Sequence, residues 1–69
     1  MTIVESSTIH AIGYKPEGQA LIVEFKSGGT YRYDGVPQAI YEGLLAADSK
    51  GKYLNQNIIG SYYTEKICS

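Results

Sequence analysis

The sequence is short of the residues that cross-link small proteins. Its 69 residues contain one cysteine, Cys68, and one histidine, His10. A single cysteine cannot form an intramolecular disulfide, and one Cys with one His gives too few ligands for a structural zinc site. A chain of this length buries only about 60% of the surface that it exposes when unfolded, so its stability is marginal. These absences predict a single domain, residues 1–69, that gains stability as a homo-oligomer.

Long apolar runs and an excess of one charge are also lacking. No stretch approaches the ~20 apolar residues that span a bilayer, and the opening residues show no secretory signal. We therefore expect a cytoplasmic protein with no membrane partner. Six Lys or Arg against seven Asp or Glu leave a net charge of −1. That balance disfavours binding of long nucleic acid, but it leaves room for a small anion held by two or three local cations.

Strand patterns fill the first half of the chain. Three segments rich in β-branched and aromatic residues, at 9–14, 20–25 and 30–33, predict strands. The turn formers of KPEG at 15–18 join the first two. The Ser-Gly-Gly connection at 27–29 needs positive φ and joins the next two. Such short connections predict an antiparallel meander.

Helical spacing follows in the second half. Apolar residues three and four apart predict a helix over 37–48, which Gly43 weakens by roughly 1 kcal/mol relative to Ala. Ser49 is a suitable N-cap for a second helix over 50–58. Residues 61–69 fit either a last strand or an extended arm. The predicted fold class is α+β, a three-stranded antiparallel meander followed by two short helices packed on one face.

Several short motifs occur in a fixed order along nearly the whole chain. They are SS at 6–7 with Ile9, IGY at 12–14, YRY at 31–33 with VP at 36–37 and Tyr41, and Ser49, Gly51, Tyr53 and Asn55 before Ile58. In this order and spacing the chain resembles the KTSC domain family, found at the carboxyl end of some lysyl-tRNA synthetases and as stand-alone bacterial and phage proteins. The resemblance implies either RNA binding, from the synthetase context, or sequestration of nucleotide immune signals, from similar small phage proteins.

The segment TYRY at 30–33 is the first candidate ligand site. On a strand, Tyr31 and Tyr33 share one face and Arg32 points to the other. The two rings suit stacking on nucleic-acid bases, and the alternative is that they pack beneath the helices as core. Arg32 is the stronger candidate for a ligand contact, because a guanidinium pairs with phosphate in bidentate fashion. Its alternative role is an ordinary solvated charge.

A second candidate site combines a helix start with an arm. Backbone N–H groups at a helix start are unpaired and attract anions, and the residues here are Ser49, Lys50, Gly51 and Lys52. The alternative is a capped helix with exposed lysines. The spacing of a phosphate-binding loop, GxxxxGK[ST], is absent, which excludes an NTPase. On the arm, the hydroxyls of Ser6 and Ser7 can bond a ligand's sugar or phosphate, or satisfy backbone at the sheet edge.

Catalytic groupings are missing from the sequence. His10 and Cys68 have no base, acid or metal ligand at a spacing that would build a reactive site. We therefore predict a protein that is not an enzyme and needs no cofactor or metal. The predicted function is a homo-oligomeric sponge for a nucleotide-type signal, a cyclic oligonucleotide or ADP-ribose derivative, in phage anti-defence. An RNA-binding accessory domain and a protein-interaction module are the alternatives, with RNA disfavoured by the charge.

Overall fold

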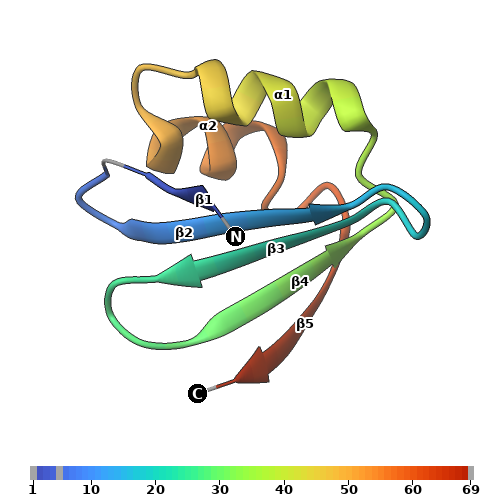
Figure 1. The fold of residues 1–69 in the computed structure, drawn as a ribbon, viewed down its shortest axis with the longest axis horizontal. Coiled ribbons are helices and arrows are strands. Elements are labelled where there is room, and N and C mark those ends of the chain that lie inside the picture. The colour runs from blue at the N-terminus through green and yellow to red at the C-terminus, as the bar shows by residue number, and fades with distance from the viewer. Residues whose placement is uncertain (1, 5, 69) are drawn as a thin grey trace.

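A single antiparallel sheet with two helices on one side makes up the computed structural model, which describes residues 2–4 and 6–68 (Figure 1). The elements in chain order are β1 (Thr2–Ile3), β2 (Ile9–Lys15), β3 (Ala20–Phe25), β4 (Thr30–Asp34), α1 (Gln38–Ala46), α2 (Lys50–Asn57) and β5 (Tyr63–Cys68). The strands lie in the order β1-β2-β3-β4-β5, and each pairs antiparallel with its neighbours. The α+β prediction, with a meander followed by two helices, is confirmed.

Both ends of the sheet differ from the meander expected from sequence. Residues 63–68 form strand β5, which settles the choice between a strand and an arm. Strand β1 was not predicted, because two residues are too few to show alternation. The sheet therefore has five strands, with β1 and β5 as its two edges.

The turns follow the expected chemistry with one exception. Gly28 and Gly29 have φ of 94° and 118°, as the connection between β3 and β4 requires. In the turn between β2 and β3, however, the left-handed residue is Gln19, with φ of 50°, and not Gly18. Pro37 adopts an extended conformation just before α1, so the helix begins one residue later than predicted.

The core lies between the sheet and the helices. Ile12, Leu21 and Val23 are fully buried on the covered face, and Leu44 of α1 and Leu54 of α2 are buried above them. Neither helix of the described residues is long and apolar enough to cross a membrane.

The two tyrosines of β4 share the covered face, as predicted, but they differ in burial. Tyr33 is 3% exposed and belongs to the core, whereas Tyr31 is partly buried and packs at its margin. Tyr33 therefore packs beneath the helices as a core residue, which was one of the two roles expected from the sequence. Tyr31 keeps an accessible part.

Alkaline pH is expected to destabilise the fold through Tyr33. Burial, with a further contribution from neighbouring Tyr31, raises the pKa of Tyr33 above its ordinary value of 10.0. The folded protein therefore holds this proton more tightly than the unfolded chain, and stability present below about pH 10 is lost as the pH rises further. The variant Tyr33→Phe has no such proton, so its melting temperature should fall less between about pH 9 and pH 11. The melting temperatures of both proteins are measured by circular dichroism. An equal decrease in the two would show that Tyr33 is not the source of the loss.

Candidate functional site

A pocket of about 520 Å³ opens between the arm that precedes β2 and the start of α2. Its polar wall contains six residues that the sequence singled out as ligand contacts: Ser6, Ser7, Ser49, Lys50, Gly51 and Lys52. The apolar wall consists of Phe25, Leu54 and Ile59. The volume lies within the range of small-molecule sites. Two segments more than forty positions apart in sequence thus meet at one cavity.

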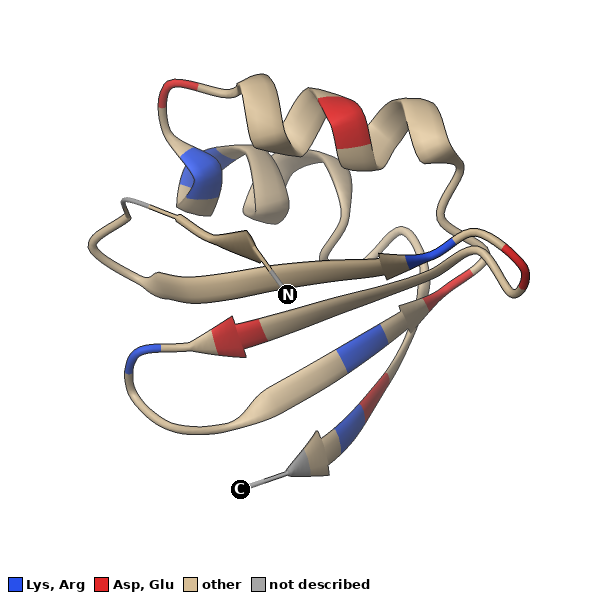
Figure 2. Ribbon diagram, viewed as in Figure 1, with Lys and Arg blue, Asp and Glu red and all other residues tan. Residues whose placement is uncertain are grey.

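The start of α2 has the cap that the sequence predicted. The Ser49 hydroxyl accepts a hydrogen bond from the Lys52 backbone N–H at 3.4 Å, and the helix begins at Lys50. The Lys50 ammonium donates to the Ala47 carbonyl at 3.0 Å, which ties this side chain to the end of the preceding segment. Lys52 is exposed. Figure 2 shows basic residues at the start of α2 and an acidic segment in the loop before it. Asp48 of that loop lines the same pocket.

The arm is held in place by its own backbone. The Ser6 hydroxyl accepts hydrogen bonds from the N–H groups of Thr8 and Ile9, both at 3.2 Å. This bonding is the backbone role that the sequence left open for Ser6, and the hydroxyl hydrogen remains able to donate. A Cβ added at Gly51 would lie 3.5 Å from the Thr8 hydroxyl oxygen, so the helix start and the arm are in contact there.

A second, more apolar pocket adjoins the first. It has a volume of about 470 Å³, and its walls include Tyr31, Tyr33 and Thr64. Phe25 and Ile59 line both pockets. The Phe25 and Tyr31 rings meet edge to face with centroids 5.5 Å apart, and the Lys66 ammonium lies 5.9 Å from the Tyr31 centroid. An aromatic surface therefore continues the wall of the polar pocket.

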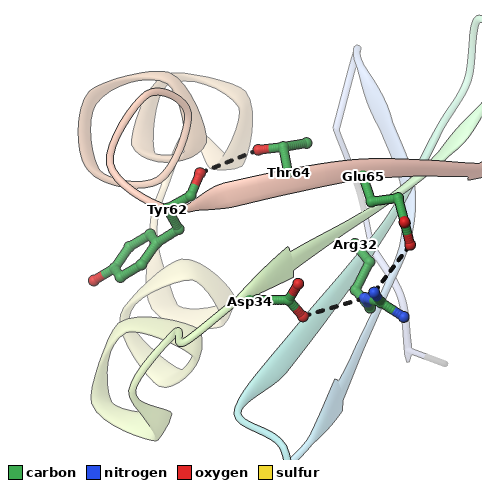
Figure 3. A network of polar contacts seen from close by, with 5 residues as sticks. All are labelled: Arg32, Asp34, Tyr62, Thr64 and Glu65. Atoms are coloured by element: carbon green, nitrogen blue, oxygen red, sulfur yellow. Dashed lines mark hydrogen bonds and ion pairs between the residues drawn. The ribbon is translucent and has the colours of Figure 1, made fainter.

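Arg32 lies on the opposite, uncovered face of the sheet. Its guanidinium pairs with Glu65 at 2.9 Å and with Asp34 at 3.2 Å (Figure 3). The contact to Asp34 is an ion pair at the Nε atom, but it lacks hydrogen-bond geometry. Two carboxylates around one guanidinium leave the cluster with a negative charge. Arg32 is therefore not part of the two pockets, and its charge is already shared by two carboxylates.

Comparison with known proteins places the chain in a family. The KTSC domain model matches residues 5–63. The chain belongs to the KTSC family. A crystal structure of a KTSC domain protein from Yersinia pestis has a TM-score of 0.93 to it at 38% identity, over 96% of this chain and 93% of that one. A protein of Stutzerimonas stutzeri, described as uncharacterized, is 45% identical over 60 residues, or 87% of this chain and 84% of its own length.

The KTSC domain also matches part of a much larger enzyme. A lysine–tRNA ligase of Nostoc sp. (strain PCC 7120) is 41% identical over 63 residues, which are 91% of this chain and 11% of the ligase. The match therefore concerns a small segment of that protein. It confirms the relationship to lysyl-tRNA ligases that the motifs suggested.

The structure gathers most of the predicted site residues of the KTSC domain, but not all. The arm serines and the residues at the start of α2 line one pocket, and the β4 tyrosines line the pocket beside it. Only Arg32 lies apart from both. Among the described residues, no group of three His, Cys, Asp or Glu is arranged to hold a metal ion.

Phe25 and Ile59 of the KTSC domain were not identified as site residues from the sequence. Phe25 ends β3 on the apolar face of that strand, where its pattern is that of a core residue. Ile59 follows α2 and is 44% exposed. An apolar residue next to a predicted helix end carries no signal that separates a ligand wall from core, so only the folded structure shows their role at the shared wall.

Proposed function

We propose that this KTSC domain binds a small nucleotide-type ligand and performs no chemistry on it. The phosphate sits against the start of α2 and the arm, and the base lies toward Phe25 and Tyr31. The observation that carries this proposal is the meeting of two segments distant in sequence at one pocket, Ser6 and Ser7 of the arm with residues 49–52 at the start of α2.

The polar pocket has the features of a site for a modest negative charge. The first N–H groups of a helix point outward, and the helix dipole favours an anion there. Lys50 and Lys52 add two positive charges, while Asp48 on the same wall subtracts one. The balance suits a ligand with one or two phosphates. It does not suit a long RNA strand, which would need a continuous basic surface.

The adjoining pocket offers what a base requires. Aromatic side chains stack on bases of any sequence, at about 1–3 kcal/mol per base in single-strand binders. Tyr31 is only partly buried, and the Phe25 ring, which contacts it edge to face, lines both pockets. A ligand with an anionic group and a flat ring can therefore contact both pockets at once.

Sequestration is the activity that follows from such binding. A protein that only binds a signal holds its free concentration low by mass action. A cyclic oligonucleotide or an ADP-ribose derivative has the required charge and rings, and removal of such a signal would serve phage anti-defence. An RNA-binding or protein-docking role would use the same aromatic residues, so the test below includes both.

Binding is tested first by thermal shift and then by calorimetry. The panel contains cyclic dinucleotides, cyclic oligonucleotides, ADP-ribose derivatives and a short single-stranded RNA. Ligand at about 100 times its dissociation constant adds roughly 2.7 kcal/mol to the stability of the folded state. For the small nucleotide that binds, Lys52→Glu is expected to raise the dissociation constant by at least about tenfold, or about 1.4 kcal/mol.

Lys15→Glu is the matched control, because it reverses an exposed cation at the end of β2, outside both pockets. It should leave the dissociation constant within about twofold. Loss of binding in Lys15→Glu with none in Lys52→Glu would show that the pocket is misassigned. A shift with RNA alone would favour the RNA-binding role, and silence across the panel would favour a protein partner.

A further inference from the structure

Strand β5 is an open edge of the sheet. Within the described chain it pairs with β4 on one side, and Figure 1 shows it as the outermost strand, away from the helices. Residues 63–67 of the strand are all exposed. Tyr63 is 68% exposed and Ile67 is 47% exposed, which is unusual for large apolar side chains on a strand. An edge of this kind is a template for a further strand.

We infer that β5 pairs antiparallel with β5 of a second copy, around a two-fold axis at Glu65. Such an axis stands perpendicular to the sheet and brings each residue opposite one on the same face. With the axis at Glu65, Tyr63 lies opposite Ile67 of the partner subunit, and Ile67 lies opposite the partner's Tyr63. The two exposed apolar residues are equidistant from Glu65, so both find an apolar partner on the uncovered face. Aromatic and β-branched cross-strand pairs of this kind stabilise sheets.

The alternation along β5 supports this arrangement. Glu65 is opposite Arg32 on the uncovered face, whereas Thr64 is opposite the buried Tyr33 on the helix side. Tyr63 and Glu65 therefore share the uncovered face, and the inferred dimer continues this alternation to Ile67. The register with β4 shifts beyond Lys66, and Ile67 has no residue of β4 assigned opposite it.

Charge disfavours the neighbouring register with its two-fold axis at Lys66. An axis at Lys66 would place two lysines opposite each other and Ile67 opposite a glutamate of the partner. The axis at Glu65 also brings two like charges together, but each carboxylate is already paired with its own Arg32 at 2.9 Å. The centre of the interface is then a row of two Arg–Glu pairs. This register matches the two exposed apolar residues of β5 and keeps each Glu65 carboxylate beside its own Arg32.

A second copy suits this edge better than an unrelated strand. A two-fold axis at Glu65 pairs Tyr63 of one copy with Ile67 of the other, so a second copy of this strand supplies both apolar partners. The opposite edge, β1, is two residues long and offers little to pair with. A 69-residue chain has a small core, so the additional apolar surface buried in a dimer would add substantially to its stability.

The inferred dimer would place a cation beside the aromatic pocket. On the helix side, Thr64 lies opposite Lys66 of the partner subunit, and Thr64 lines the pocket formed with Tyr31. This consequence rests on the proposed function, but the dimer does not. The experiments below are carried out without any nucleotide, so failure of one proposal is distinguishable from failure of the other.

Analytical ultracentrifugation over roughly two orders of magnitude of protein concentration tests the dimer. Tyr63→Lys and Ile67→Lys should each weaken dimerisation by at least about tenfold, because each places a charge where an apolar pair forms. Both side chains are exposed in the monomer, so circular dichroism should show an intact fold. Ile3→Lys, which changes a 74% exposed residue at the β1 edge, is the control and should leave the dimer unchanged.

Disulfide cross-linking tests the register. In a Cys68→Ser background, Glu65→Cys puts two cysteines directly opposite each other, with Cβ atoms about 4.5–5.5 Å apart. This variant should form a covalent dimer on mild oxidation. Tyr63→Cys should not, because the two copies of that residue would be about 13 Å apart along the strands. A mixture of Tyr63→Cys and Ile67→Cys chains should cross-link with each other.

Three results would overturn the inference. A monomer at every concentration would leave the edge free for a strand of some other protein. A dimer unaffected by both lysine variants would use another surface. A dimer that cross-links at Tyr63→Cys and not at Glu65→Cys would have a different register.

Discussion

Replacing Tyr33 by alanine is expected to bring the protein close to unfolding. The ring is 3% exposed and lies in the core with Leu21 and Val36. Truncation of a large buried aromatic residue costs about 3–5 kcal/mol, through lost burial and the cavity left behind. A chain of this length has a total stability of roughly 3–10 kcal/mol. Urea denaturation of the variant should show a free energy of unfolding about 3–5 kcal/mol below that of the parent, with a correspondingly lower midpoint.

Tyr31→Ala is the matched comparison, since it removes the same side chain two residues earlier on the same strand face. Tyr31 is only partly buried, so the loss in unfolding free energy should be clearly smaller. If Tyr31→Ala costs as much as Tyr33→Ala, the division between a core tyrosine and a ligand-facing tyrosine is wrong.

Replacing Gly43 by alanine is expected to destabilise the protein, against the helix propensity of the two residues. Propensity alone predicts a gain of roughly 1 kcal/mol in the middle of α1. In the structure, a Cβ at Gly43 would overlap the Tyr53 hydroxyl and lie 3.0 Å from the ring carbon that bears it. The hydroxyl donates to the Ile40 carbonyl at 3.3 Å, which fixes the ring against α1. Overpacking of this kind costs about 1–3 kcal/mol.

The Tyr53→Phe variant separates the two effects in a double-mutant cycle. Removal of the hydroxyl relieves the shortest contact, so Gly43→Ala with Tyr53→Phe should lose less stability than the sum of the single changes. The measurement is the free energy of unfolding of all four proteins. A Gly43→Ala protein more stable than the parent would mean that helix propensity outweighs the contact with Tyr53.

Much of the fold was predictable because local pattern and global structure agree. Strand β3, Ala20–Phe25, has the bounds given by its alternation, and the glycines at 28 and 29 adopt the positive φ that their turn requires. The contact between Gly43 and Tyr53, by contrast, could not be predicted from local pattern. Helix propensity describes a residue within its own helix, and the ring that occupies the space above Gly43 comes from the next helix.

The sequence predicted individual residues of the candidate site, but it did not predict which of them lie together in the folded protein. A serine followed by small and basic residues at a helix start indicates an anion site from local sequence alone. The alternation on β4 correctly placed Arg32 opposite the tyrosines. The ion pair between Arg32 and Glu65 could not be predicted from the sequence. It depends on the pairing of β4 with β5, and the sequence did not decide whether residues 63–68 form a strand.

The two edges of the sheet determine how this domain can be attached to other proteins. The chain begins at β1 and reaches β5 last, and these strands lie at opposite edges of the sheet. A polypeptide joined ahead of Thr2 would therefore extend from the β1 edge and leave the β5 edge clear. In the inferred dimer, a polypeptide fused at the β1 edge and the partner subunit at the β5 edge would lie at opposite edges of the sheet, so one domain could carry both.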